Sequence, residues 1–172
     1  MKYDYKALYE KNAAFYHARP NAKKALKLAS PALTLLFFVA YAALLVYGAF
    51  ENRFAPYDFV KVFFSPLLAL LLVSVLRLAI ERPRPYSAHG SAISPLKSRK
   101  GRDNDSFPSR HLACAFVISM MFLPYLPLAG IGLLLASGLL GYVRFALGLH
   151  YPSDLAAGGA IGLACGIIAC FL

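Results

Sequence analysis

The residues of this sequence that could carry chemistry lie at the borders of long apolar runs. A hydroxyl, a guanidinium and an imidazole stand together at one border, in Ser109-Arg110-His111. Backbone N–H groups at the start of a helix are unpaired and attract anions, so this border is a candidate anion site. Related groups stand at the borders of neighbouring runs: Arg77, Arg84, Arg144, His150 and Asp154.

These residue types favour chemistry on a phosphoryl group. Guanidinium groups bind phosphate oxygens through paired hydrogen bonds and stabilise the charge that develops during phosphoryl transfer. One neutral imidazole could attack phosphorus while a second protonates the departing oxygen. Asp154 follows His150 by four residues and could fix its tautomer. Any one of these arginines, taken alone, could instead place its guanidinium group at the membrane interface without binding a ligand.

The apolar runs that hold these groups predict a helical membrane protein. The chain has 172 residues, 59% of them hydrophobic, and a mean hydropathy of +0.58, too high for an ordinary soluble core. About 20 apolar residues suffice to span a bilayer as a helix. We expect an all-α bundle of about five transmembrane helices: 28–50, 59–80, two within 112–143 separated at Pro124 and Pro127, and one opening at 151–154.

Residues 1–27 are expected to form a basic N-terminal segment, and residues 28–172 the transmembrane domain. Apolar and aromatic side chains recur in this N-terminal segment at nearly helical spacing: Tyr5, Leu8, Tyr9, Phe15 and Tyr16. We predict a short amphipathic helix lying on the membrane surface. A disordered basic tail is the alternative.

Small side chains within the apolar runs are expected to serve helix packing. Gly158, Gly162 and Gly166 recur every four residues, a spacing that lets two membrane helices approach closely. The cysteines also fall inside apolar runs, where neither a disulfide framework nor metal-ligand spacing is indicated: Cys114, Cys165 and Cys170.

The net charge of +10 indicates anionic lipid or a phosphorylated substrate as partner rather than nucleic acid, because the basic residues flank apolar runs and form no soluble basic domain. One cluster precedes the central motif and could steer anionic lipid to the site or simply keep a loop solvated: Lys97, Arg99, Lys100 and Arg102. His89, in the same loop, receives no role.

Five crossings would bring the polar groups to one membrane face, where they form three ordered motifs. Arg77 is followed after six residues by Arg84-Pro85, then comes Pro108-Ser109-Arg110-His111, and Arg144 is followed after five residues by His150 and after three more by Asp154. This ordered set resembles the signature motifs of the type 2 phosphatidic acid phosphatase and vanadium haloperoxidase superfamily, in its membrane branch.

The resemblance implies a role for each motif residue. His150 would be the nucleophile that forms a phosphohistidine, Asp154 would orient it, and His111 would be the general acid. No metal or other cofactor is implied. The remaining motif residues would bind the phosphoryl oxygens: Arg77, Arg84, Ser109, Arg110 and Arg144.

Three positions depart from the usual family pattern. The family usually has Lys at Arg77, Gly at Arg110 and Ser at Val143. None of these changes removes a catalytic group, so we expect activity to persist and substrate preference to differ. Arg110 adds a guanidinium that could contact a second phosphate.

The leading hypothesis is therefore an integral membrane lipid phosphatase. Its substrate would be a lipid phosphomonoester or diphosphate, such as phosphatidate, phosphatidylglycerol phosphate or an isoprenyl diphosphate. Two alternatives stay open: a vanadium-dependent haloperoxidase-like enzyme, and a non-catalytic membrane protein whose basic loop holds anionic lipid headgroups.

Charge distribution and family resemblance predict opposite sides of the membrane for the site. The predicted site face carries 16 of the 18 Lys and Arg residues, and 12 against 2 when the four motif arginines are removed. Positive charge favours the cytoplasmic side, which we expect on this count. The resemblance implies the opposite face, because many bacterial relatives have the site outside.

Overall fold

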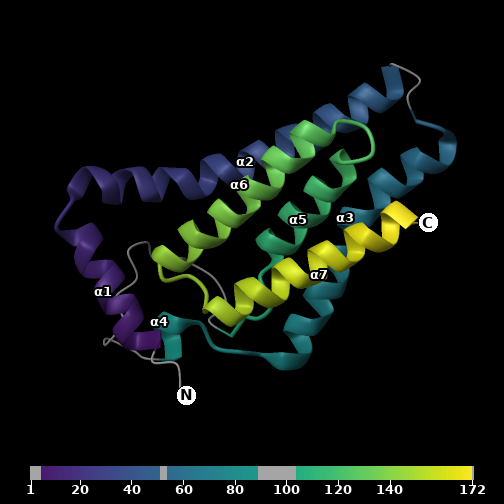
Figure 1. Cartoon of the computed structure of the whole chain (residues 1–172). Coiled ribbons are helices and arrows are strands. Elements are labelled where there is room, and N and C mark those ends of the chain that lie inside the picture. Colours follow the sequence, from purple (N-terminus) through teal and green to yellow (C-terminus); the bar gives the residue numbers. More distant parts are fainter. Residues whose placement is uncertain (1–4, 51–53, 89–103, 172) are drawn as a thin grey trace.

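The computed structural model describes residues 5–50, 54–88 and 104–171, and within these residues the chain forms helices and no strands. Lys97, Arg99, Lys100, Arg102 and His89 lie outside the described residues. Figure 1 shows the helices in order: α1 (Tyr5–His17), α2 (Pro20–Phe50), α3 (Pro56–Ile80), α4 (Pro85–Ala88), α5 (Arg110–Phe122), α6 (Pro127–Ala146) and α7 (Pro152–Phe171).

Four helices are long and apolar enough to cross a membrane: α2, α3, α6 and α7. The expected third span is the exception, because α5 has only 13 residues and is about 20 Å long against a hydrocarbon core of roughly 30 Å. It ends at Phe122, ahead of a turn that contains Pro124, and α6 begins at Pro127. The all-α membrane bundle is confirmed, with four long helices and one short one.

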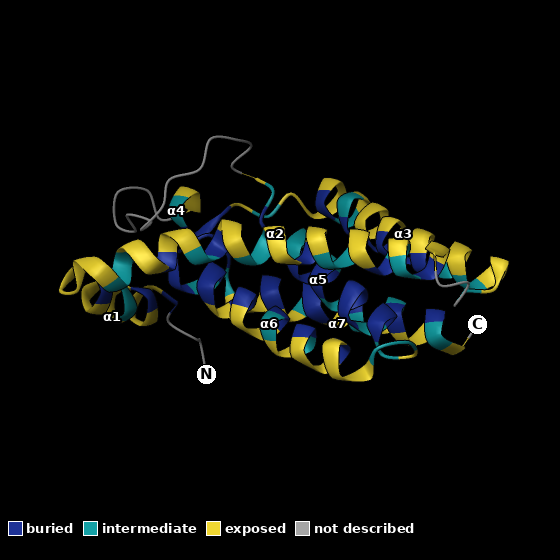
Figure 2. Ribbon diagram, turned by 90° about the horizontal axis from the view of Figure 1, so that it is seen from above, coloured by how far each residue is buried: buried dark blue, intermediate teal, exposed yellow. Residues whose placement is uncertain are grey.

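The bundle is apolar on its outer surface and buries a small set of charged groups within a largely apolar interior, which suits a lipid environment. Many large hydrophobic residues of the long helices are exposed. Figure 2 marks exposed residues in yellow along the outer sides of these helices. Charged groups in a membrane protein are expected to face the interior of the bundle. The buried side chains accordingly include five charged or titratable groups: Arg77, Arg84, Arg144, His150 and Asp154.

The short helix α5 is the centre of the bundle and packs against α2, α3, α6 and α7. Its contact with α7 is very close, because a Cβ at Gly158 would lie 2.5 Å from the Ser109 carbonyl oxygen and one at Gly162 would lie 2.4 Å from that of Ala113. The predicted glycine packing face is confirmed. The start of α5 is thereby held against the first turns of α7.

The N-terminal segment contains the expected helix, and two of its tyrosines pack against the connection between α6 and α7. The Tyr5 ring lies 4.7 Å from the Tyr151 ring, and Tyr9 packs against Gly148. These tyrosines are buried, whereas Leu8 and Phe15 are exposed. Helix α1 therefore covers the connection between α6 and α7.

The first long helix begins earlier than expected, at Pro20 rather than near residue 28. Residues 20–27 consist largely of Ala, Lys and Leu, which are strong helix formers, and proline is well accommodated in a first turn. Nothing in this stretch interrupts the helix, so the break in the N-terminal region falls between α1 and α2 instead.

Candidate active site

The three motifs meet at one end of the bundle, where α3 ends, α5 and α7 begin and α6 ends (Figure 1). Hydrogen bonds to main-chain carbonyls join them. The Ser109 N–H donates to the Asp154 carbonyl at 3.0 Å, and the Arg84 Nη1 donates to the Leu149 carbonyl at 3.1 Å. The convergence expected from topology is present in the structure.

His150 lies just after α6 and is 1% exposed. Its Nδ1 atom lies 3.0 Å from the Ser106 carbonyl oxygen and 3.6 Å from Asp154 Oδ2. The Ser106 carbonyl is the nearer acceptor, and a carbonyl can only accept, so Nδ1 carries the proton. This tautomer leaves the lone pair on Nε2 for chemistry.

The surroundings of His150 keep its ring neutral. Burial lowers the pKa of His150 to about 4, and the charges of Arg84 and Arg144 act in the same direction, whereas Asp154 opposes them. A neutral imidazole is the form that can act as a nucleophile. The electrostatics of the site therefore suit nucleophilic attack at neutral pH.

Asp154 is fully buried in the first turn of α7 and accepts hydrogen bonds from three segments. Ser106 Oγ and the Tyr151 N–H donate to Oδ2, the latter at 2.9 Å, and Arg82 Nη1 donates to Oδ1 at 2.8 Å. A buried carboxylate needs such partners to remain ionised. The carboxylate is thus held rigidly beside His150.

Arg82 and Ser106 are functional candidates that sequence reasoning did not select. Arg82 also donates to Ser153 Oγ at 2.8 Å, and its guanidinium lies 4.3 Å from the centre of the Tyr151 ring. In the sequence, Arg82 stands two residues before a motif arginine and Ser106 three residues before Ser109. Their proximity to the motifs was the only available signal.

The Asp105 carboxylate gathers three of the predicted phosphate ligands. Arg84 Nη2 lies 2.6 Å from Asp105 Oδ1, while Arg77 Nη2 and Arg110 Nη2 lie 3.5 and 3.6 Å from Oδ2. Carboxylate and phosphate oxygens are equivalent partners for guanidinium groups. Asp105 was not predicted either, and it occupies the anion position of this arginine cluster.

The other predicted residues lie at the same end of the bundle. Ser109 Oγ is buried with no hydrogen-bond partner among the described residues, and Arg144 Nη2 lies 3.5 Å from Thr34 Oγ1 of α2. His111 and Arg110 line a cavity together. The described part of the chain contains no group of three or more His, Cys, Asp and Glu side chains that could hold a metal ion.

Val143, where the family usually has serine, is a packing residue. It is 3% exposed and belongs to an apolar cluster that joins α1, α2 and the end of α6: Tyr16, Leu26, Val143, Ala146, Leu147 and Leu149. A serine hydroxyl would be surrounded there by apolar groups. The valine therefore fits its neighbours in this chain.

Sequence comparisons relate the chain to known phosphatases. The profile of the PAP2 superfamily matches residues 58–171, which include all three motifs. Two lipid A 1-phosphatases are similar to this chain. The one from Rhizobium johnstonii is 31% identical over 102 residues, or 59% of this chain, and the one from Rhizobium etli is 35% identical over 107 residues, or 62% of this chain. The matched regions are 42% and 44% of those proteins, so the chain spans less than half the length of these curated relatives.

Solved structures share the fold. Aquifex aeolicus LpxE aligns with a TM-score of 0.56 and 26% identity over 87% of this chain and 94% of its own. A transmembrane PAP2-type phosphatidylglycerolphosphate phosphatase from Bacillus subtilis aligns with a TM-score of 0.59 and 24% identity over 96% and 92% of the two chains, which supports the fold alone. Together with the family profile, the motifs and the apolar helices, these likenesses establish that the chain is a multi-pass membrane member of the PAP2 superfamily.

Proposed function

We propose that this chain is a membrane-embedded lipid phosphatase that releases phosphate through a phosphohistidine at His150. The observation that carries the proposal is a buried, neutral imidazole whose Nδ1 is bound by Ser106, beside the arginine charges of Arg84 and Arg144. This arrangement provides a nucleophile and stabilisation for a phosphoryl group in one place. The names of the relatives point to the same reaction class.

In the first half-reaction, the His150 Nε2 lone pair attacks phosphorus and forms a P–N bond. The bond between phosphorus and the lipid oxygen breaks, and His111 gives its proton to that oxygen. The lipid product leaves as an alcohol, or as a monophosphate when the substrate is a diphosphate. Asp154 stabilises the positive charge that the His150 ring acquires.

In the second half-reaction, water attacks the phosphohistidine. His111, now neutral, takes a proton from the water, the P–N bond breaks and inorganic phosphate leaves. Both steps spread negative charge over the phosphoryl oxygens, which arginines stabilise. Arg77, Arg110, Arg144 and Ser109 are the proposed ligands of these oxygens. Arg84 is the fifth, and its bonds to Asp105 and Leu149 hold it in position.

The proposed substrate is an amphiphile with a terminal phosphate. Phosphatidate, phosphatidylglycerol phosphate and isoprenyl diphosphates belong to this class, and the relatives' names add the 1-phosphate of lipid A. Because the arginine cluster holds Asp105, the substrate phosphate has to displace that carboxylate from Arg77 and Arg110. On the charge count we place the site on the cytoplasmic face.

Phosphate release from these lipids in detergent micelles, measured for the wild type and for His150→Ala, tests the proposal. We expect release by the wild type alone. Equal rates for both proteins would sink the mechanism. Bromination of an organic acceptor on addition of vanadate, peroxide and bromide, without phosphate release, would favour the haloperoxidase alternative.

A further inference from the structure

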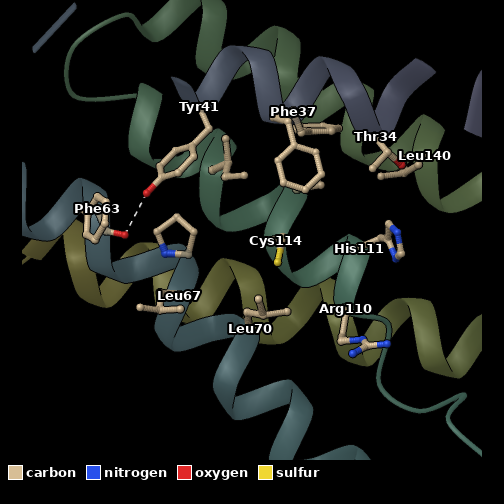
Figure 3. Close-up of a pocket in the computed structure, with 14 residues that line it drawn as sticks. Thr34, Phe37, Tyr41, Phe63, Leu67, Leu70, Arg110, His111, Cys114 and Leu140 are labelled. Carbon is tan, nitrogen blue, oxygen red and sulfur yellow. Dashed lines mark hydrogen bonds between the residues drawn. The ribbon is translucent and has the colours of Figure 1, made fainter. Parts of the chain in front are cut away.

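A cavity of about 440 Å³ lies beside the site, between α2, α3, α5 and α6. Figure 3 shows its lining, in which Phe37 and Tyr41 come from α2 and Leu67 and Leu70 from α3. Phe38 and Leu67 also line it and are exposed on the lipid-facing surface, at 67% and 42%. The cavity therefore opens to the bilayer between α2 and α3.

The guanidinium and imidazole groups of the cavity lining lie at one end. Arg110 and His111, from the first turn of α5, stand at the end that leads to the site, and the rest of the lining is largely apolar (Figure 3). A phosphate beside Arg110 is electrostatically favoured, whereas a charge deeper in the cavity would be costly. The lining thus complements a molecule with an anionic head and a hydrocarbon chain.

Tyr41 bridges α2 and α3 at the opposite end. Its hydroxyl donates to the Phe63 carbonyl at 2.9 Å, and Figure 3 shows this pair across the cavity from Arg110. Pro66, close by on α3, lacks an N–H and interrupts the hydrogen bonding of this turn. From Arg110 to Ile118, the lining of α5 extends about 12 Å, somewhat less than the roughly 15 Å of half a hydrocarbon core.

We propose that this cavity binds one acyl chain of the lipid phosphate substrate and that Tyr41 sets the chain length accepted. The proposal rests on the proposed function, because the chain is placed by its phosphate at Arg110 and His111. A chain that moves from lipid into the cavity gains little hydrophobic free energy, since both surroundings are apolar. Selection comes from fit: a short chain leaves a void, and a long chain meets the Tyr41 ring.

Chain-length profiles test the role of Tyr41. The quantity to measure is kcat/KM for phosphatidates in mixed micelles, with acyl chains from dioctanoyl to distearoyl. It is compared among the wild type, Tyr41→Ala and Tyr47→Ala. Tyr47 is a matched control because it lies on α2 outside the cavity lining. We expect the kcat/KM of the wild type to fall roughly tenfold for chains longer than the preferred length. Tyr41→Ala should prefer longer chains, whereas Tyr47→Ala should keep the preference of the wild type. Identical profiles for an active wild type and Tyr41→Ala would overturn the proposal and leave the proposed function standing.

A binding measurement decides the proposal without any turnover. The chain contains no tryptophan, so Phe37→Trp in a His150→Ala background places a single reporter in the cavity wall. We expect phosphatidate with brominated chains to quench it several times more strongly than phosphatidylcholine with the same chains. Leu35→Trp, at an exposed position of α2, is the control and should be quenched equally by both. Equal quenching at Phe37→Trp would overturn the proposal even if no phosphatase activity were found.

Discussion

At the scale of single residues, the proposed nucleophile His150 depends on partners outside the motif positions. Ser106 contributes both its carbonyl to His150 and its hydroxyl to Asp154, and Arg82 binds the same carboxylate. Removing one donor from a buried carboxylate costs about 1 to 3 kcal/mol. These two residues therefore determine how well Asp154 and His150 are aligned.

Ser106→Ala should lower kcat roughly tenfold to a hundredfold while the protein still folds, because only the hydroxyl contact to Asp154 is lost. Ser119→Ala is the matched control, since Ser119 is an equally buried serine that donates within α5 to the Ala115 carbonyl. Steady-state rates and thermal unfolding of both variants check this. A kcat for Ser106→Ala equal to that of Ser119→Ala would contradict the role of Ser106.

The pH dependence should reflect the neutral ring of His150. Because burial lowers its pKa to about 4, the nucleophilic form predominates above that pH, and its protonation removes activity only as the pH falls through about 4. We expect the acid limb of kcat/KM, corrected for ionisation of the substrate, to lie well below the ordinary histidine value of about 6.5. A limb at the ordinary value would show that His150 is not buried as described.

The sequence identified the motif residues because their types and spacing carry the signal. It did not identify Asp105, whose importance comes from contacts with Arg77, Arg84 and Arg110. Arg82 was missed for the same reason, because its partner Asp154 is 72 residues away in the chain. No spacing rule within one segment reports such a pair.

At the scale of elements, the α5–α7 contact fixes the distance between the second and third motifs. Gly162→Ala should lower the free energy of unfolding by roughly 1 to 3 kcal/mol. The new Cβ would lie 2.4 Å from the Ala113 carbonyl oxygen, and backbone atoms cannot move aside without disturbing the helix. Gly138→Ala has no atom within 4 Å of the new Cβ and should be neutral or up to about 1 kcal/mol stabilising. Thermal unfolding of both variants in detergent checks this prediction. Equal unfolding midpoints for the two variants would refute the packing argument.

Helix periodicity and proline positions predicted most elements, including the break at Pro124 and Pro127 that separates α5 from α6. They did not predict that the tyrosines of α1 cover the α6–α7 connection. The decisive feature there is Gly148, which has a φ of +74° and lies so close to Tyr9 that a Cβ would be 2.7 Å from the ring. An amphipathic pattern shows that a face is buried, but the same pattern suits a membrane surface and a protein partner.

At the scale of the whole molecule, the proposed orientation in the membrane rests on the count of loop charges. Ser98→Cys, in a chain whose native cysteines are replaced by alanine, should resist an impermeant maleimide in intact cells and react after permeabilisation, as a cytoplasmic site requires. Asn52→Cys, in the connection between α2 and α3, should show the opposite behaviour. Ready labelling of Ser98→Cys in intact cells would reverse the assigned orientation.

The central claim is that His150 carries the phosphoryl group during turnover. The most direct measurement mixes the protein with a lipid substrate labelled at its phosphate and stops the reaction rapidly without acid. The labelled residue is then identified. We predict alkali-stable, acid-labile label on His150, formed within one turnover and absent from His150→Ala. Turnover without protein-bound label, or label on another residue, would contradict the account.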